Sequence, residues 1–154
     1  MRRTILIALV ALVCGADAPS TGKKSADVVK LKATSTKPDA NGKQTITVVL
    51  TIDKSWHIYA NPVGSDDLSS VQTVVNLTST GKLEDVSIDY PHGKLIKDPI
   101  VGNYAVYENE VTIKATVKRP AGSKEDLEVT AKIQACSDKS CLPTSTLKSK
   151  VEAK

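Results

Sequence analysis

Two cysteines near the C-terminus are the residues best suited to chemistry. Cys136 and Cys141 stand in the segment Ala-Cys-Ser-Asp-Lys-Ser-Cys-Leu-Pro. Two thiols at this spacing can close into a disulfide, and an accessible disulfide can exchange with a partner thiolate through a mixed disulfide. The same pair could instead pin a turn, to which the loop-entropy model assigns only roughly 2 kcal/mol for so small a ring. Spacing alone leaves both roles open, a redox pair and a structural staple.

A histidine and a tyrosine are the other candidates for a site. In the segment Trp-His-Ile-Tyr at 56–59, alternate residues of a strand face the same way, so Trp56 and Ile58 share one face. His57 and Tyr59 share the other. In one interpretation Trp56 anchors the core and His57 is an exposed strand residue. In the other, His57 and Tyr59 flank the cysteines, where a histidine could stabilise a thiolate.

A metal or an organic cofactor is not expected. Two cysteines lack the second pair of ligands that a zinc site needs, and His57 and His92 have no ligand spacing between them. The chain has only one methionine, at position 1, and two histidines, so it offers few ligands for copper. A chaperone-like or metal-handling protein is therefore the least favoured class. The sequence therefore predicts a site without a metal or an organic cofactor.

The elements that must position these residues are strands. Apolar and polar residues alternate with a period of two at 29–33, 46–52, 111–117 and 127–133, with shorter candidates at 71–77, 86–90, 105–107 and 147–151. Turns rich in Gly, Pro, Asn and Asp separate them, and no amphipathic helix stands out. One apolar face per strand predicts two antiparallel sheets on a shared core. We expect an all-β fold, an immunoglobulin-like antiparallel sandwich of about seven to nine strands, with a closed barrel as the weaker alternative.

The parity of the strand at 127–133 bears on the cysteines. Its apolar residues occupy odd positions, so Cys136 is expected to face away from the core, at the outer or edge side of a strand end. A β-bulge would reset this phase. Cys141 can then close back on Cys136, and Pro143 keeps the following backbone extended. An accessible position of this kind suits an exchange centre better than a staple.

The N-terminus has the order of a secretory signal peptide. A basic start is followed by an apolar run at 5–13 that is too short to span a bilayer, and then by small residues. The pattern Ala-x-Ala favours cleavage after Ala18, although Pro19 is an awkward neighbour and cleavage after Gly15 or Ala16 is also open. We expect a signal peptide at 1–18, a flexible tether at 19–27 and one domain at 28–154, located in the periplasm or otherwise exported.

Cys14 lies near the expected cleavage site and raises the question of a lipid anchor. A lipoprotein signal requires a small residue directly before the cysteine, and Val13 is not small. If Cys14 leaves with the signal peptide, the mature chain keeps two cysteines in a compartment that permits a disulfide. No later stretch is long and apolar enough for a transmembrane helix, so we expect contact with a membrane only if Cys14 is lipidated.

The charge distribution argues against nucleic acid as a partner. The formal net charge is +4, and the lysines are spread evenly along the chain. A nucleic-acid-binding domain gathers its basic residues on one face. An even distribution is typical of a solvated surface.

Several segments, taken together and in this order, match one family. They are Trp-His-Ile-Tyr-Ala-Asn-Pro at 56–62, Gly-Ser-Asp-Asp-Leu at 64–68, Tyr-Pro at 90–91 with Gly-Lys at 93–94, Val-Tyr-Glu at 106–108, and the Gln-Ala-Cys to Cys-Leu-Pro segment at 134–143. Over nearly all of residues 28–151, the sequence resembles the N-terminal periplasmic domain of the DsbD thiol–disulfide interchange protein family.

The resemblance implies a function and a set of site residues. The family domain is an immunoglobulin-like sandwich whose cysteine pair passes reducing equivalents between thioredoxin-like or membrane thiol-transfer partners and envelope proteins, without a cofactor. Carried over, Cys136 and Cys141 form the redox pair and His57 and Tyr59 line the site. A short cap loop that shields the cysteines falls on Asp98, Pro99, Ile100 and Val101. Where the best-known members carry an aromatic residue over the disulfide, this chain has Ile100.

Two functions follow as alternatives. We expect no membrane or thioredoxin-like domain after Lys154, in which case either such parts are separate proteins or the domain has become a binding module. We expect an electron carrier of the thiol–disulfide oxidoreductase type. The alternative is a non-catalytic immunoglobulin-like adaptor with a structural disulfide.

Overall fold

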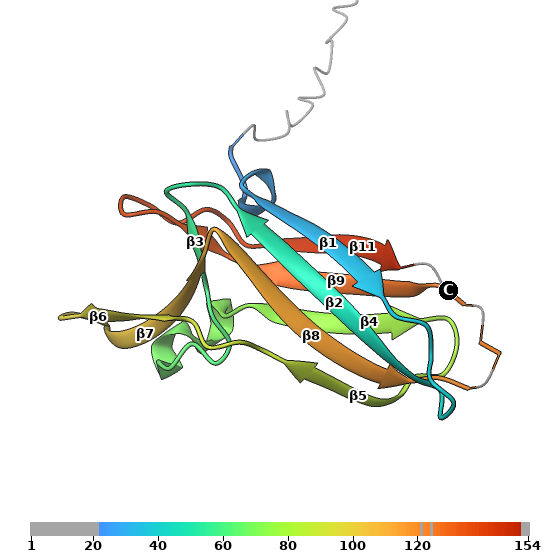
Figure 1. The fold of residues 1–154 in the computed structure, drawn as a ribbon. Coiled ribbons are helices and arrows are strands. Elements are labelled where there is room, and N and C mark those ends of the chain that lie inside the picture. Colours follow the sequence, from blue (N-terminus) through green and yellow to red (C-terminus); the bar gives the residue numbers. More distant parts are fainter. Residues whose placement is uncertain (1–21, 121, 124, 152–154) are drawn as a thin grey trace, which may run out of the picture.

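The computed structural model describes residues 22–120, 122–123 and 125–151, and within them the chain is almost entirely β (Figure 1). The eleven strands are β1 (Val29–Ser35), β2 (Lys43–Ile52), β3 (His57–Tyr59), β4 (Val74–Ser79), β5 (Glu84–Asp89), β6 (Lys94–Asp98), β7 (Gly102–Glu108), β8 (Glu110–Lys118), β9 (Leu127–Ile133), β10 (Ala135–Cys136) and β11 (Ser145–Val151). Two short 3₁₀ helices, η1 (Ser25–Asp27) and η2 (Asp66–Val71), accompany them. None of the helices in these ranges has the length and apolar character needed to cross a membrane. The predicted signal peptide and Cys14 lie outside the described residues.

The strands form three antiparallel sheets. One has the order β1-β2-β8-β5 and a second has the order β11-β9-β4, and these two make the body of an immunoglobulin-like sandwich. The third sheet, β10-β3-β7-β6, extends the molecule at one end (Figure 1). The predicted fold class is confirmed, because the apolar faces of two separate antiparallel sheets enclose a common core.

Alternating side chains from β2, β8 and β9 fill that core. The inward positions of these strands are buried while their neighbours face solvent, as the period of two predicts. Burying one aliphatic side chain of this size contributes about 1.5–3 kcal/mol. The fully buried members include Ile46, Leu50, Ile113, Leu127 and Ile133.

The strand count exceeds the predicted seven to nine, and the difference arises in the third sheet. The chain changes sheets after β9, at Gln134, and again between β7 and β8, at Asn109, where φ is 60°. The three strands without a predicted counterpart are β3, β6 and β10, and all three belong to the third sheet. β10 has two residues and β3 has three, too few to display a period of two. Similarly, the strand predicted from 71 begins at Val74, because η2 occupies the residues before it.

The flexible tether predicted for 19–27 is wrong at its C-terminal end. Ser25 opens η1 and is completely buried, and Asp27 accepts a hydrogen bond from the backbone nitrogen of Lys24 at 2.6 Å. The small polar residues there are typical of a linker. Tertiary contacts with Ala135 and Pro143 nevertheless hold the segment against the sandwich. Residues 19–21 lie outside the described part of the chain.

Candidate functional site

Cys136 and Cys141 form a disulfide at the end of the sandwich that carries the third sheet. Their sulfurs are 2.03 Å apart, their Cα atoms are 4.0 Å apart, and the two residues pair as an antiparallel bridge. The loop between them is closed by a hydrogen bond from the Ser137 nitrogen to the Ser140 carbonyl at 2.8 Å. Outside the disulfide, the Leu142 nitrogen donates to the Ala135 carbonyl, also at 2.8 Å. The disulfide therefore lies across a tight, backbone-bonded hairpin.

The two cysteines differ sharply in exposure. Cys136 is 2% exposed, whereas Cys141 is exposed to solvent. The packed core cluster includes Ala135 but not Cys136, so Cys136 faces away from the core as its parity predicts. The further expectation that this position makes Cys136 accessible is wrong, since neighbouring groups of the third sheet cover it. The exposed cysteine of the pair is Cys141.

His57 and Tyr59 lie beside the buried cysteine. β3 pairs with β10 so that His57 is the direct cross-strand partner of Cys136. Directly opposed residues of an antiparallel pair present their side chains on the same face. The Tyr59 hydroxyl lies 3.6 Å from the Cys136 sulfur. Trp56 and Ile58 pack on the core, as the first interpretation expects, but His57 is half-buried beside Cys136 and is not an exposed strand residue.

A second tyrosine, which the sequence analysis did not single out, extends this face. Tyr104 on β7 lies with its ring 5.9 Å from that of Tyr59, and Tyr59 in turn meets the His57 ring edge-on at 6.2 Å. Tyr104 stands four residues before Glu108 on the same strand and so shares its face. Recognising it requires the pairing of β3 with β7, which places His57 opposite Glu108.

The charges around His57 come from three elements. Burial lowers the pKa of His57, and the Lys94 ammonium lowers it further, while the carboxylates of Glu108 and Asp138 oppose this shift. Lys94 is itself paired with Glu108, with an Nζ to Oε1 distance of 3.0 Å. Burial, with a smaller contribution from Tyr104, raises the pKa of Tyr59. A neutral imidazole and a protonated phenol therefore face Cys136 at neutral pH.

The lowered pKa of His57 makes folding stability depend on pH. Unfolded histidine titrates near 6.5, so between that pH and the lower folded pKa the unfolded state binds more protons than the folded state. We expect the free energy of unfolding to fall as the pH decreases from about 7 to about 5. Urea titrations at several pH values measure this slope, and H57Q should flatten it. H92Q, at the other and exposed histidine, is the control, and equal slopes in H57Q and the wild type would contradict the prediction.

The predicted cap loop lies at the tip of the β6–β7 hairpin, at the same end of the molecule as the disulfide (Figure 1). The Asp98 carboxylate accepts hydrogen bonds from the nitrogens of Val101 and Ile100, at 2.9 and 2.7 Å, and these bonds lower its pKa. Pro99 completes the turn, and Gly102 follows with φ 81°. Ile100 is 92% exposed. The side chain that contacts the Cys136 sulfur is that of Tyr59. Shielding by residues 98–101 stays a prediction.

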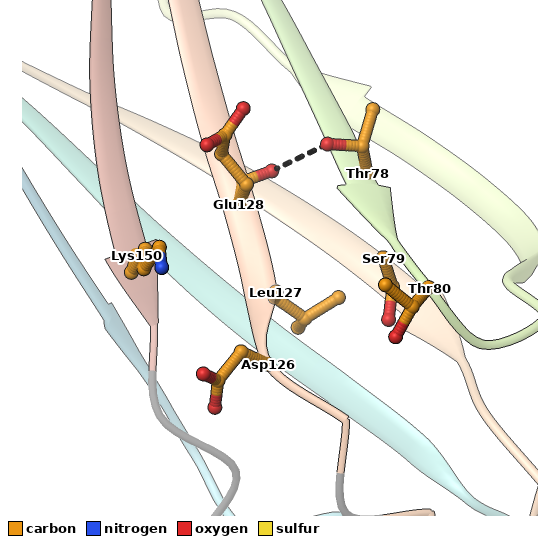
Figure 2. A pocket seen from close by; sticks show the side chains of 7 residues that line it. All are labelled: Thr78, Ser79, Thr80, Asp126, Leu127, Glu128 and Lys150. Carbon is orange, nitrogen blue, oxygen red and sulfur yellow. Dashed lines mark hydrogen bonds between the residues drawn. The ribbon is translucent and has the colours of Figure 1, made fainter.

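A separate hollow lies at the opposite end of the sandwich (Figure 2). It is open to solvent, and at its edge the Thr78 hydroxyl donates to the Glu128 carbonyl at 3.5 Å. Its lining residues are Thr78, Ser79, Thr80, Asp126, Leu127, Glu128 and Lys150. Across the described residues, no three His, Cys, Asp or Glu side chains gather as a metal site would require. The disulfide end is therefore the candidate site.

Comparisons with known proteins point to one family. The family model described as "Thiol:disulfide interchange protein DsbD, N-terminal" matches residues 25–153. No curated protein sequence matches significantly.

A solved structure of a periplasmic domain has a similar fold. The N-terminal periplasmic domain of ScsB from Proteus mirabilis is similar with a TM-score of 0.57 at 20% identity, covering 79% of this chain and 46% of that one. This chain thus spans less than half of that ScsB chain. The reduced DsbD N-terminal domain of Neisseria meningitidis has a TM-score of 0.45 at 15% identity, covering 77% of this chain and 82% of that one.

Proposed function

The chain belongs to the family of the N-terminal domain of the thiol:disulfide interchange protein DsbD, and on this premise we propose that it exchanges its Cys136–Cys141 disulfide with thiols of partner proteins. The observation that carries the proposal is the asymmetry of the pair. Cys141 is an exposed residue, whereas Cys136 is 2% exposed and its sulfur contacts a tyrosine hydroxyl. A structural staple has no need of this difference, whereas an exchange centre uses it.

The exchange runs in two steps. A partner thiolate attacks the Cys141 sulfur, the bond between the two cysteines breaks, and Cys136 leaves as a thiolate. The Tyr59 hydroxyl, 3.6 Å away, donates a hydrogen bond to that thiolate and stabilises it. A second partner thiolate then attacks the mixed disulfide and releases Cys141. The partner is oxidised by two electrons to a disulfide, and this domain is reduced to a dithiol that takes up two protons.

The reverse sequence delivers the electrons. The Cys141 thiolate attacks the disulfide of an acceptor, and Cys136 resolves the mixed disulfide. The proposed donors are thioredoxin-like periplasmic proteins or a membrane thiol-transfer protein, and the acceptors are other proteins of the cell envelope. In this proposal His57 lines the site in its neutral form, and residues 98–101 form the rim on which a partner docks.

The adaptor alternative has one observation in its favour. The β6–β7 hairpin presents three apolar side chains to solvent, Leu95 at 58%, Ile100 at 92% and Val101 at 44% exposure. Such a patch could bind a partner without any exchange. A variant with both cysteines changed to serine would then bind its partner as the wild type does, and would lose only stability.

A titration of the disulfide against glutathione tests the exchange function. We expect reduced and oxidised forms to coexist within the range of glutathione buffers, because one sulfur is accessible and the closed ring is small. Alkylation of free thiols followed by mass measurement gives the ratio of the two forms. A disulfide that persists below about −300 mV would behave as a structural one and would overturn the proposal.

A further inference from the structure

We propose that Ser25 is a positioning residue for the Cys136–Cys141 disulfide, an inference that rests on the exchange function proposed above. Ser25 begins η1, ahead of the first strand, and is completely buried. It lies 110 residues before Ala135 in the sequence, yet its hydroxyl reaches the loop that carries both cysteines.

One hydroxyl joins the two stems of the disulfide loop. The Ser25 oxygen accepts a hydrogen bond from the Ala135 nitrogen at 2.9 Å and donates one to the Pro143 carbonyl at 2.8 Å. Ala135 directly precedes Cys136, and Pro143 stands two residues after Cys141. The backbone nitrogen of Ser25 also donates to the Pro143 carbonyl, at 3.3 Å. Ser25 thus closes the loop from outside, just beyond the disulfide itself.

Ser25 is in turn held by the N-terminal strap, which we define as residues 23–28. The Ala26 nitrogen donates to the Ser145 hydroxyl at 3.1 Å, and the Lys23 ammonium lies 5.1 Å from the centre of the Trp56 ring. Val28, at the end of the strap, is completely buried, and its carbonyl accepts a hydrogen bond from the Asp53 nitrogen at 2.9 Å. These contacts tie the strap to β11 and to the segment before β3, so Ser25 is held in place on both sides.

The consequence concerns the balance between disulfide and dithiol. That balance depends on how closely the fold holds the two thiols together after reduction. When the loop is preorganised, re-forming the disulfide loses less conformational entropy. With the Ser25 hydroxyl in place, the stems at Ala135 and Pro143 stay joined in the dithiol. Without it, the Ala135 nitrogen loses its partner, and the stems keep only backbone hydrogen bonds such as the one from the Leu142 nitrogen to the Ala135 carbonyl, so they separate more readily. The reduced form then gains freedom, and the disulfide becomes easier to reduce.

A purely structural role for Ser25 would look different. If its hydrogen bonds only held the fold together, S25A would destabilise the oxidised and reduced proteins equally. The equilibrium between the two forms would then be unchanged, because the redox and unfolding equilibria form a closed thermodynamic cycle. The reduction potential is therefore the readout that separates positioning from general support.

The experiment compares the full chain with three variants in dithiothreitol redox buffers. We expect S25A to lower the equilibrium constant for disulfide formation by about tenfold, equivalent to about 30 mV. S25T keeps the hydroxyl and should restore the wild-type constant. S145A is the matched control, because it frees the Ala26 nitrogen and loosens the strap without touching either stem. A wild-type constant for S25A, alongside a lowered free energy of unfolding, would overturn the inference.

A measurement on the unaltered protein covers the case in which S25A does not fold. Hydrogen exchange at the Ala135 amide should remain slow after the disulfide is reduced, since the Ser25 oxygen still accepts that hydrogen bond. Fast exchange in the reduced protein would equally overturn the positioning role. Failure of the proposed exchange function can be told apart from failure of the Ser25 inference. The glutathione titration of the wild-type protein detects the former without any Ser25 variant.

Discussion

In the Cys136→Ser variant we expect the remaining Cys141 to react quickly with a disulfide reagent, and in Cys141→Ser we expect the remaining Cys136 to react at least about tenfold more slowly. The difference follows from access, on which thiol–disulfide exchange depends. Cys141 is exposed, and Cys136 is 2% exposed beneath the Tyr59 hydroxyl. The release of thionitrobenzoate from dithiobisnitrobenzoate, followed by its absorbance, measures both rates on the same scale.

The same pair of variants identifies the sulfur that a protein partner attacks. With a thioredoxin-like protein that lacks its resolving cysteine, Cys136→Ser should accumulate a covalent complex on a non-reducing gel, and Cys141→Ser should give little. The variant without either cysteine is the control for other adducts. Equal labelling rates would contradict the assignment of Cys141 as the attacked residue. Faster labelling of Cys136 would make Cys136 the entry point for electrons.

Truncation of Ile58 to alanine should lower the free energy of unfolding by about 2–5 kcal/mol. Ile58 is completely buried on β3, directly opposite Ala135, so its removal opens a cavity beneath the strands that carry the site. Urea denaturation of the oxidised protein measures the loss. Because β3 also carries His57 and Tyr59, we expect Cys136 to be labelled faster when Ile58→Ala is combined with Cys141→Ser than in Cys141→Ser alone.

The hairpin supplies a matched control for this substitution. Ile100→Ala removes the same atoms from a side chain that is 92% exposed, and should change the free energy of unfolding by no more than about 0.5 kcal/mol. A loss of several kcal/mol at Ile100 would mean that the β6–β7 tip packs against the body of the protein. A loss below about 1 kcal/mol at Ile58 would contradict its place in the core.

Much of the sandwich was predictable because its long strands carry a local pattern. β2, β8 and β9 each alternate over seven or more residues, and their buried positions are those that the alternation predicts. The third sheet was not predictable in the same way. β10 and β3 are too short to show a period, and they form a sheet only by pairing with each other and with β7.

By itself, the sequence determined the all-β class and the closure of Cys136 onto Cys141, because alternation and close spacing are local properties of the chain. It also determined that Cys136 faces away from the core, through the parity of its strand. Only the tertiary structure decided which sulfur is accessible, since Tyr59, 77 residues away, lies against Cys136 and leaves Cys141 open. It likewise decided that Ser25, in a segment with the composition of a linker, is buried against the disulfide loop. Burial depends on which distant segments pack together, and no local pattern in the chain encodes that.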